Sequence, residues 1–254
     1  MDKKNLRTSF GAVSSLYDSV RPDYPEALIA DVIAISAIPA AGTILELGIG
    51  TGKATKPFLQ RGYFLTALDI SSKQITIAKK NLVEFQHIHY IVSSFETADL
   101  PLNTYDLVFA AQTFHWIDPS IRYQKSAAVL KPNGYLAIFS NFQCADAPLE
   151  KEIRKLYSKY CSASFSVSTY GTVDSVYDLF QSSLFFENVQ KIRYLRDLSY
   201  SAKDYLSLLG TFSFISTLPN DQKELFFTDV RALLHGQEEL VIPTESFLLI
   251  GRKR

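Results

Sequence analysis

The fold is decided by the stretch from Thr43 to Lys53, which reads TILELGIGTGK. Its opening part contains an apolar run, Ile44, Leu45 and Leu47, which is typical of a short buried β-strand. Three glycines then follow at alternate positions, Gly48, Gly50 and Gly52. The residues after them have a composition compatible with a helix. A strand that turns into a helix exposes the free N–H groups of the helix, and glycines let a ligand approach the backbone closely. We therefore expect a ligand site at this turn.

An acidic residue closes the next apolar run. Residues 64–68 predict a second strand, and Asp69 stands where that strand ends. Parallel neighbours end at the same edge of a sheet, so the Asp69 carboxylate is expected beside the glycine turn. There it would accept hydrogen bonds from the two hydroxyls of a ribose.

The charges around the turn favour a cationic ligand over a dinucleotide. The dinucleotide fingerprint GxGxxG needs a third glycine where this chain has Lys53. Glu46 precedes the first glycine, where a carboxylate would repel a pyrophosphate and suit a cation. S-adenosylmethionine has no phosphate and carries a sulfonium and an ammonium, so it fits this pattern better.

The run from Glu46 to Gly52, together with Asp69, resembles the first two motifs of class I S-adenosylmethionine-dependent methyltransferases. The resemblance implies an α/β fold with a doubly wound, Rossmann-like, seven-stranded and mostly parallel sheet. It also implies an antiparallel last strand, a helical insertion near the C-terminus, and S-adenosylmethionine as the cofactor. A nicotinamide-dependent oxidoreductase is the first alternative, disfavoured by Lys53 and by the lack of a Tyr-x-x-x-Lys pair.

Periodicity and turn residues predict the other elements. Strands are expected at 88–92, 105–111, 135–140, about 188–198 and 244–251, and helices at about 53–61, 120–130 and 174–182. Three helix starts are read from capping patterns. These patterns are Ser71 with Gln74, Asp118 with Pro119, and Asp221 with Glu224. We expect a single domain over 1–254, with an N-terminal arm and helix at 1–40 and a cofactor-binding core at 41–141. The C-terminal part, 142–254, would include a helical cover at about 199–238.

The N-terminal arm also resembles a known group. Its spacing is similar to that of the trans-aconitate methyltransferase-like (type 11) small-molecule methyltransferases, and it is carried by Phe10, Tyr17, Arg21, Pro22, Tyr24 and Pro25. The resemblance implies that Arg21 pairs with the methionine carboxylate, with Tyr17 packed nearby. The alternative is a surface turn with an ion pair.

The loop over the carboxyl ends of the strands is expected at residues 112–117. Its His115–Trp116 pair resembles the same group, in which the pair faces the cofactor and the acceptor cavity. His115 is the one candidate catalytic base, and a structural histidine is the alternative. The segment 94–96 follows the third strand, where the resembled family contacts adenine; the alternative there is a loop with a helix cap.

The predicted sites are as follows. The cofactor-binding residues are Tyr17, Arg21, Glu46, Gly48, Ile49, Gly50, Asp69, Ile70, Ser94, Phe95, Glu96, Ala111 and Gln112. The acceptor-binding residues are Tyr24, Trp116, Phe142, Thr211 and Ser213.

Composition limits the function classes. Lys+Arg and Asp+Glu number 26 each, so no net charge attracts nucleic acid or a membrane surface. Cys144 and Cys161 are expected to be reduced thiols, and no His lies at metal-ligand spacing beside them. The first residues lack the apolar segment of a signal peptide. We expect a cytoplasmic monomer or homodimer that acts on a small molecule, without a metal.

Methyl transfer from a sulfonium is a displacement that depends mainly on alignment. A base is needed only if the acceptor must lose a proton. A carboxylate or hydroxyl oxygen is the favoured acceptor. A non-catalytic S-adenosylmethionine-binding protein remains an alternative, and a protein or RNA methyltransferase is disfavoured because the sequence has no basic surface or Asn-Pro-Pro-Tyr-type motif.

Overall fold

The computed structural model describes residues 19–161 and 172–254. The chain divides into two compact units. Among these residues, unit 1 comprises 19–22, 142–161 and 195–245, and unit 2 comprises 23–141, 172–194 and 246–254. The predicted subdivision at residues 40, 141 and 199–238 stays a prediction.

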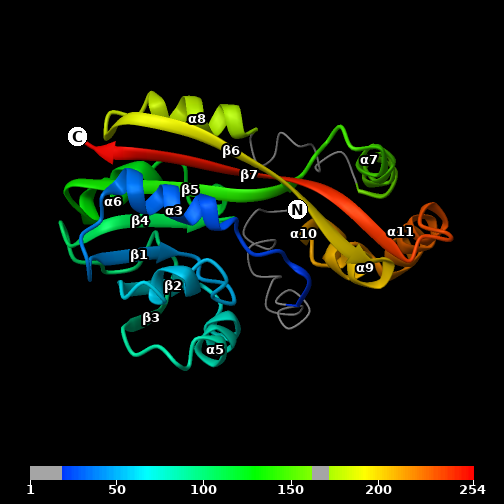
Figure 1. Ribbon diagram of the computed structural model, residues 1–254, viewed down its shortest axis with the longest axis horizontal. Coiled ribbons are helices and arrows are strands. Elements are labelled where there is room, and N and C mark those ends of the chain that lie inside the picture. The colour runs from blue at the N-terminus through cyan, green and yellow to red at the C-terminus, as the bar shows by residue number, and fades with distance from the viewer. Residues whose placement is uncertain (1–18, 162–171) are drawn as a thin grey trace. The chain divides into compact units, whose positions relative to one another are not determined.

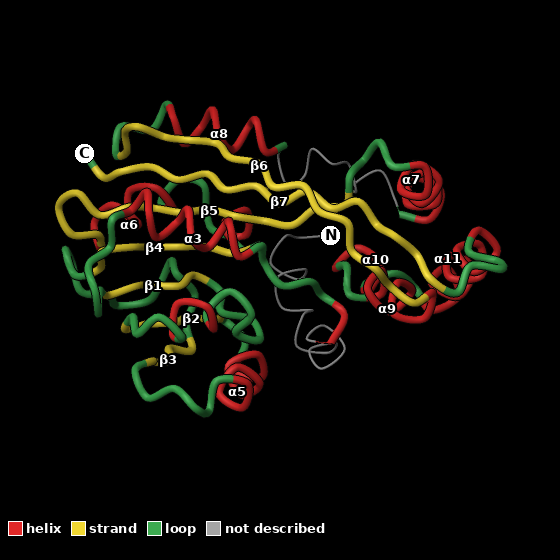
Figure 2. Tube along the Cα trace, in the orientation of Figure 1, coloured by secondary structure: helices red, strands yellow, loops and turns green. Residues whose placement is uncertain are grey.

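A seven-stranded sheet in the order β3-β2-β1-β4-β5-β7-β6 forms the framework. The strands are β1 (Thr43–Leu47), β2 (Phe64–Asp69), β3 (Ile88–Val92), β4 (Tyr105–Ala111), β5 (Leu130–Gln143), β6 (Phe186–Ser201) and β7 (Glu239–Lys253). The first five are parallel to one another, and the last strands are antiparallel (Figures 1 and 2). The predicted α/β fold, with its antiparallel last strand, is confirmed.

The strand order reverses between β1 and β4, which lie side by side although β2 and β3 separate them in the sequence. Both strands are almost wholly buried, because helices cover both faces of a parallel sheet. The carboxyl ends of strands at such a reversal are where open α/β sheets bind ligands. The glycine turn follows β1 at this position.

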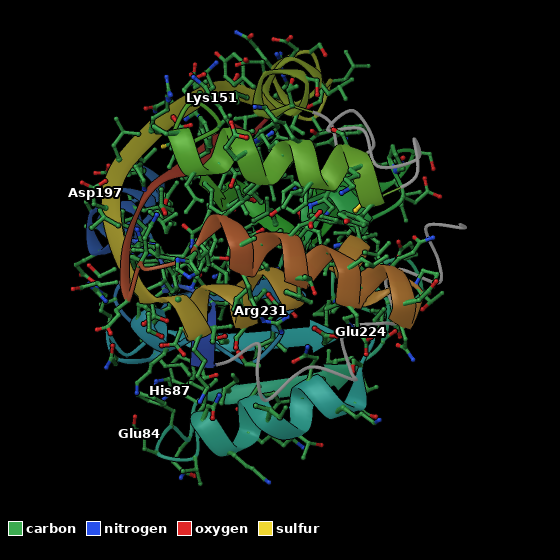
Figure 3. The ribbon with its side chains drawn as sticks, turned by 90° about the vertical axis from the view of Figure 1, so that its right-hand side faces the viewer. Glu84, His87, Lys151, Asp197, Glu224 and Arg231 are labelled. Carbon is green, nitrogen blue, oxygen red and sulfur yellow. The ribbon has the colours of Figure 1, made fainter. Side chains whose placement is uncertain are left out.

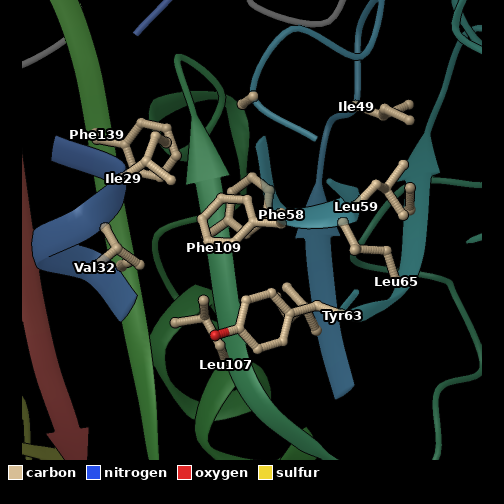
Figure 4. Packing of buried hydrophobic residues seen from close by; sticks show 14 of the residues in the cluster. Ile29, Val32, Ile49, Phe58, Leu59, Tyr63, Leu65, Leu107, Phe109 and Phe139 are labelled. Carbon is tan, nitrogen blue, oxygen red and sulfur yellow. The ribbon is translucent and has the colours of Figure 1, made fainter. Parts of the chain in front are cut away.

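One face of unit 2 is covered by α3 (Glu26–Ser36), α4 (Lys56–Leu59) and α5 (Ser72–Asn81). Its centre is an aromatic stack of three rings (Figure 4). The centroid of the Phe109 ring lies 4.9 Å from that of Phe58 and 5.5 Å from that of Phe139. The other face is covered by α6 (Arg122–Val129) and α8 (Val173–Gln181). These two layers fix β1 and β4 and so fix the ends of both strands.

Unit 1 has its own apolar core. It is formed by α7 (Pro148–Tyr160), α9 (Ala202–Gly210), α10 (Ser213–Ser216) and α11 (Asn220–Leu233) with part of β7. In α11, Phe226 and Val230 are buried, whereas Glu224 and Arg231 are exposed (Figure 3). This four-residue spacing is the amphipathic pattern of a surface helix.

Several predicted element boundaries are wrong. Helix α6 begins at Arg122, because the Asp118 carboxylate accepts hydrogen bonds from Ser120 in the preceding turn instead of capping the helix. Helix α11 begins after Pro219, and neither residue of the predicted capping box makes a side-chain cap bond. By contrast, Ser71 accepts from the Gln74 N–H as predicted.

No helix in the described part of the chain is long and apolar enough to span a bilayer. Within residues 19–161 and 172–254, no three His, Cys, Asp or Glu side chains gather as a metal site would require.

The core of unit 1 contains a buried acid. Glu150 lies in the first turn of α7 and is 4% exposed. Its Oε1 lies 3.0 Å from Arg154 Nε, whereas Oε2 has no hydrogen-bond partner among the described residues. Burial raises the pKa of Glu150 from its ordinary 4.5 to about 7, although Arg154 opposes the shift.

This raised pKa predicts a pH-dependent stability. A folded-state pKa above the unfolded value gives stability that is complete below pH 4.5 and is lost as the pH rises through about 7. We expect the loss to be on the order of 3 kcal/mol. Glu150→Gln should flatten the fall in melting temperature between pH 5 and 8, measured by calorimetry.

Glu152→Gln is the matched control, because Glu152 lies on the same helix, is exposed and pairs with Lys155. This variant should keep the wild-type fall in melting temperature between pH 5 and 8. The same fall in Glu150→Gln would show that Glu150 does not cause the pH dependence.

Candidate functional site

The turn after β1 is shaped by three glycines with positive φ. Gly48 has φ +78°, and its N–H donates to the Leu68 carbonyl at 2.8 Å. A Cβ on Gly48 would lie 2.4 Å from Thr113 Cγ2, so no larger residue fits. Gly50 has φ +56°, but a Cβ there would meet no described atom within 4 Å. The backbone of the turn therefore borders open space at Gly50, which is where a ligand could approach it.

Asp69 holds the turn from the end of β2. Its Oδ2 accepts from the Gly50 N–H at 3.0 Å, and its Oδ1 accepts from the Ser71 N–H at 2.8 Å. Asp69 as a residue is partly exposed. The structure therefore brings Asp69 and Gly50 together, as predicted from the sequence. Ile70 directly follows Asp69 in the chain.

Glu46 lies below the turn and is completely buried. Its Oε2 accepts a 2.5 Å hydrogen bond from the Thr55 hydroxyl, and its Oε1 has no partner among the described residues. Burial raises the pKa of Glu46 well above its usual range, the Thr55 bond opposes this, and the nearby Asp69 charge adds to it. A cation next to Oε1 would favour the ionised form and satisfy an oxygen that otherwise has no partner.

The segment after β3 uses its side chains mainly for its own folding. The Phe95 ring is 1% exposed and belongs to a core cluster of unit 2, with the Lys125 ammonium 5.4 Å from its centroid. Glu96 Oε1 accepts from the Asp118 N–H at 3.2 Å. Ser94 Oγ lies 2.9 Å from the Thr97 hydroxyl. If Phe95 contacts adenine, its backbone would make the contact, because its side chain is part of the core.

The end of β4 carries a strained turn. Ala111 is its last residue, and Gln112 follows with φ +58°, a conformation that residues with a side chain rarely adopt. The Gln112 amide donates to the Asn141 carbonyl at 3.0 Å. His115 and Trp116 lie in the short helix η2 (Phe114–Trp116), and their rings are 4.9 Å apart. Both are partly exposed, as expected for residues that border a site.

Two further predicted residues have structural contacts in unit 2. Ile49 is 3% exposed and packs in the core, so only its backbone faces the turn. Tyr24 packs edge-on against Phe139 with ring centroids 4.9 Å apart.

The remaining predicted site residues lie in unit 1. Arg21 Nε donates to the Thr211 hydroxyl at 2.8 Å, and its guanidinium lies 4.5 Å from the Phe212 ring centroid. Thr211 and Ser213 are buried, and Phe142 is 46% exposed. Tyr17 lies outside the described residues. The structure thus joins Arg21 to Thr211, a pairing that the sequence did not predict.

Three residues around the turn were missed from the sequence. Thr55 bonds to Glu46, Thr113 packs against Gly48, and Asn141 accepts from Gln112. None carries a motif, because each matters only through a contact made by the fold.

Residues 45–138, which contain the glycine turn, Asp69 and β4, match the family described as methyltransferase domain. An uncharacterized methyltransferase of Schizosaccharomyces pombe is 27% identical over 219 residues, covering 86% of this chain and 84% of that protein. A malonyl-[acyl-carrier protein] O-methyltransferase of Marinomonas is 28% identical over 149 residues, covering 58% of this chain and 54% of that protein.

The fold is similar to that of a putative type II methyltransferase from Anaeromyxobacter dehalogenans, with a TM-score of 0.66 and 21% identity over 92% of this chain and 97% of that one. Together with the matched residues and the sheet order, these findings support a class I S-adenosylmethionine-dependent methyltransferase.

Proposed function

We propose that this enzyme binds S-adenosylmethionine at the Gly48–Gly52 turn and methylates an oxygen of a small-molecule acceptor. The observation that carries the proposal is the turn itself. It combines open space at Gly50, a buried acid oxygen at Glu46 without a partner among the described residues, and the carboxylate of the partly exposed Asp69.

The residues fit the cofactor by their chemistry. Asp69 already accepts two backbone hydrogen bonds, which orient its carboxylate, and carboxylate oxygens can accept further bonds from ribose hydroxyls. Glu46 would be ionised by a nearby positive charge, which gives it a preference for a cationic ligand. S-adenosylmethionine would supply a methyl group activated by its sulfonium.

Other residues keep the roles that the sequence predicts. Ser94, Glu96, Ala111 and Gln112 would border the adenosyl part, the last two through their backbone at the end of β4. Arg21, with Tyr17, would hold the methionine end, in which case its guanidinium would exchange Thr211 for a carboxylate. Tyr24, Trp116, Phe142, Thr211 and Ser213 would line the acceptor pocket.

A carboxylate is the acceptor that we favour. The name of the Marinomonas relative describes an O-methyltransferase that acts on a malonyl group, which carries a free carboxylate. A carboxylate needs no base, so the chain's residues would only orient it and exclude water. With a hydroxyl acceptor, His115 would have to remove the proton.

The ribose assignment predicts the effect of Asp69→Ala. Loss of hydrogen bonds to a charged acceptor should weaken S-adenosylmethionine binding by roughly 1–3 kcal/mol, measured by titration calorimetry. Asp99→Ala, in an exposed loop of the same unit, is the control and should bind like the wild type. Unchanged affinity in Asp69→Ala, or heat with NADH and none with S-adenosylmethionine, would refute the site.

The open space at Gly50 predicts a contrast between two glycine variants. Both Gly48→Ala and Gly50→Ala place a side chain at positive φ, which costs about 1 kcal/mol of stability. Only Gly48→Ala also clashes with Thr113, so it should have the lower melting temperature. Gly50→Ala should fold but bind S-adenosylhomocysteine at least about tenfold more weakly, because its methyl group fills the space assigned to the ligand.

Normal binding by Gly50→Ala would show that the ligand lies elsewhere. Equal melting temperatures for the two variants would contradict the clash at Gly48.

The carboxylate acceptor predicts a small effect of His115→Asn. Dicarboxylic acids and their thioesters should be methylated to base-labile methyl esters, measured with labelled donor, and kcat should fall less than about tenfold in the variant. His235→Asn, an exposed histidine of unit 1, is the control. A fall of about a hundredfold or more would indicate a hydroxyl acceptor instead. Tight donor binding with no turnover on acids, phenols or amines would favour the non-catalytic alternative.

A further inference from the structure

Asn141 lies near the end of β5 and touches neither the predicted cofactor nor the acceptor in our assignment. We propose that Asn141 is a positioning residue for the cofactor site, because the supports on both sides of the glycine turn lead back to it. This inference rests on the proposed function, since it concerns the same turn.

The first support runs through Gln112. The Gln112 side chain donates to the backbone carbonyl of Asn141 at 3.0 Å, which helps to hold Gln112 at its positive φ. The next residue is Thr113, whose side chain packs against the Cα of Gly48 and whose hydroxyl lies 3.4 Å from the Gly48 carbonyl. The strained turn after β4 therefore fixes the start of the glycine turn.

The second support runs through Asp23. The Asn141 side-chain amide donates to the Asp23 carbonyl in a long, 3.4 Å hydrogen bond. The Asp23 carboxylate in turn pairs with Lys53 at 3.2 Å, directly after Gly52. Asp23 is mostly exposed, and an exposed ion pair alone contributes little. The amide of Asn141 adds a second bond to the same residue, and this bond is also exposed.

Ser246 fixes the orientation of the Asn141 amide. The completely buried Ser246 hydroxyl donates to Asn141 Oδ1 at 2.6 Å. With Oδ1 occupied by this donor, the amide nitrogen is turned toward the Asp23 carbonyl. A buried hydroxyl that sets the direction of a neighbouring amide is the arrangement expected of a support that orients other residues.

The test measures the affinity for S-adenosylhomocysteine by calorimetry together with the melting temperature. Asn141→Ala should weaken binding about threefold to tenfold, as expected for a lost hydrogen bond. Asn141→Asp keeps an acceptor for Ser246 but places an oxygen opposite the Asp23 carbonyl, so it should weaken binding at least as much. Ser246→Ala should weaken binding in the same direction.

Thr244→Val is the matched control for Ser246→Ala. It removes a buried hydroxyl two residues away on β7 whose one hydrogen bond within the described part of the chain is local, to the Ile242 carbonyl. It should leave the affinity unchanged even if it lowers the melting temperature. If Thr244→Val and Ser246→Ala change affinity equally, Asn141 has no positioning role.

A double variant tests whether the two supports share Asp23. Lys53→Met and Asn141→Ala together should weaken binding by less than the product of their separate effects, because either change releases the same segment. If the double variant weakens binding by the full product of the two separate effects, the two supports do not share Asp23. If the wild type does not bind S-adenosylhomocysteine, the proposed function fails. If it binds and every Asn141 variant binds equally well, only the positioning role fails.

Discussion

The close approach of Thr113 to the backbone of Gly48 is the constraint on which the site depends. It occurs where β1 and β4, adjacent and parallel, separate at their carboxyl ends. A Cβ at position 48 would collide with the Thr113 side chain, so this position needs a glycine, and its φ is positive. That turn directs the N–H of Gly50 toward Asp69 and leaves the space beside Gly50 open.

The second constraint is electrostatic. Glu46 is buried beneath the turn with one hydrogen bond, from Thr55, although burial of an acid without full compensation is unfavourable. A purely structural residue at this position could be apolar at no such cost. The acid is therefore explained more readily by a positively charged ligand than by the stability of the folded chain.

Much of the core of unit 2 was predictable from the sequence. The bounds of β3 and β4 match the predicted ranges, because short apolar strands between turn residues give a strong local pattern. The glycine turn and Asp69 were found for the same reason. Helix starts were less predictable. Asp118 had the residue type of a cap, but its carboxylate bonds within the preceding turn.

The long-range contacts could not be predicted. Arg21 and Thr211 are 190 residues apart, and no local pattern links them. Phe95 has a residue type that suits both an adenine pocket and a core, and only the packing shows that its ring belongs to the core. Gln112 at positive φ breaks a local rule, which is a recurrent property of residues at functional sites.

The division of the chain has an evolutionary consequence. Unit 1 is made of three stretches of sequence, separated by parts of unit 2. No single cut at either end removes it, and exchanging it between two relatives would require several coordinated recombination events. Diversification of unit 1 is therefore expected to proceed through point substitutions and changes in loop length, while unit 2, which contains the glycine turn, stays recognisable.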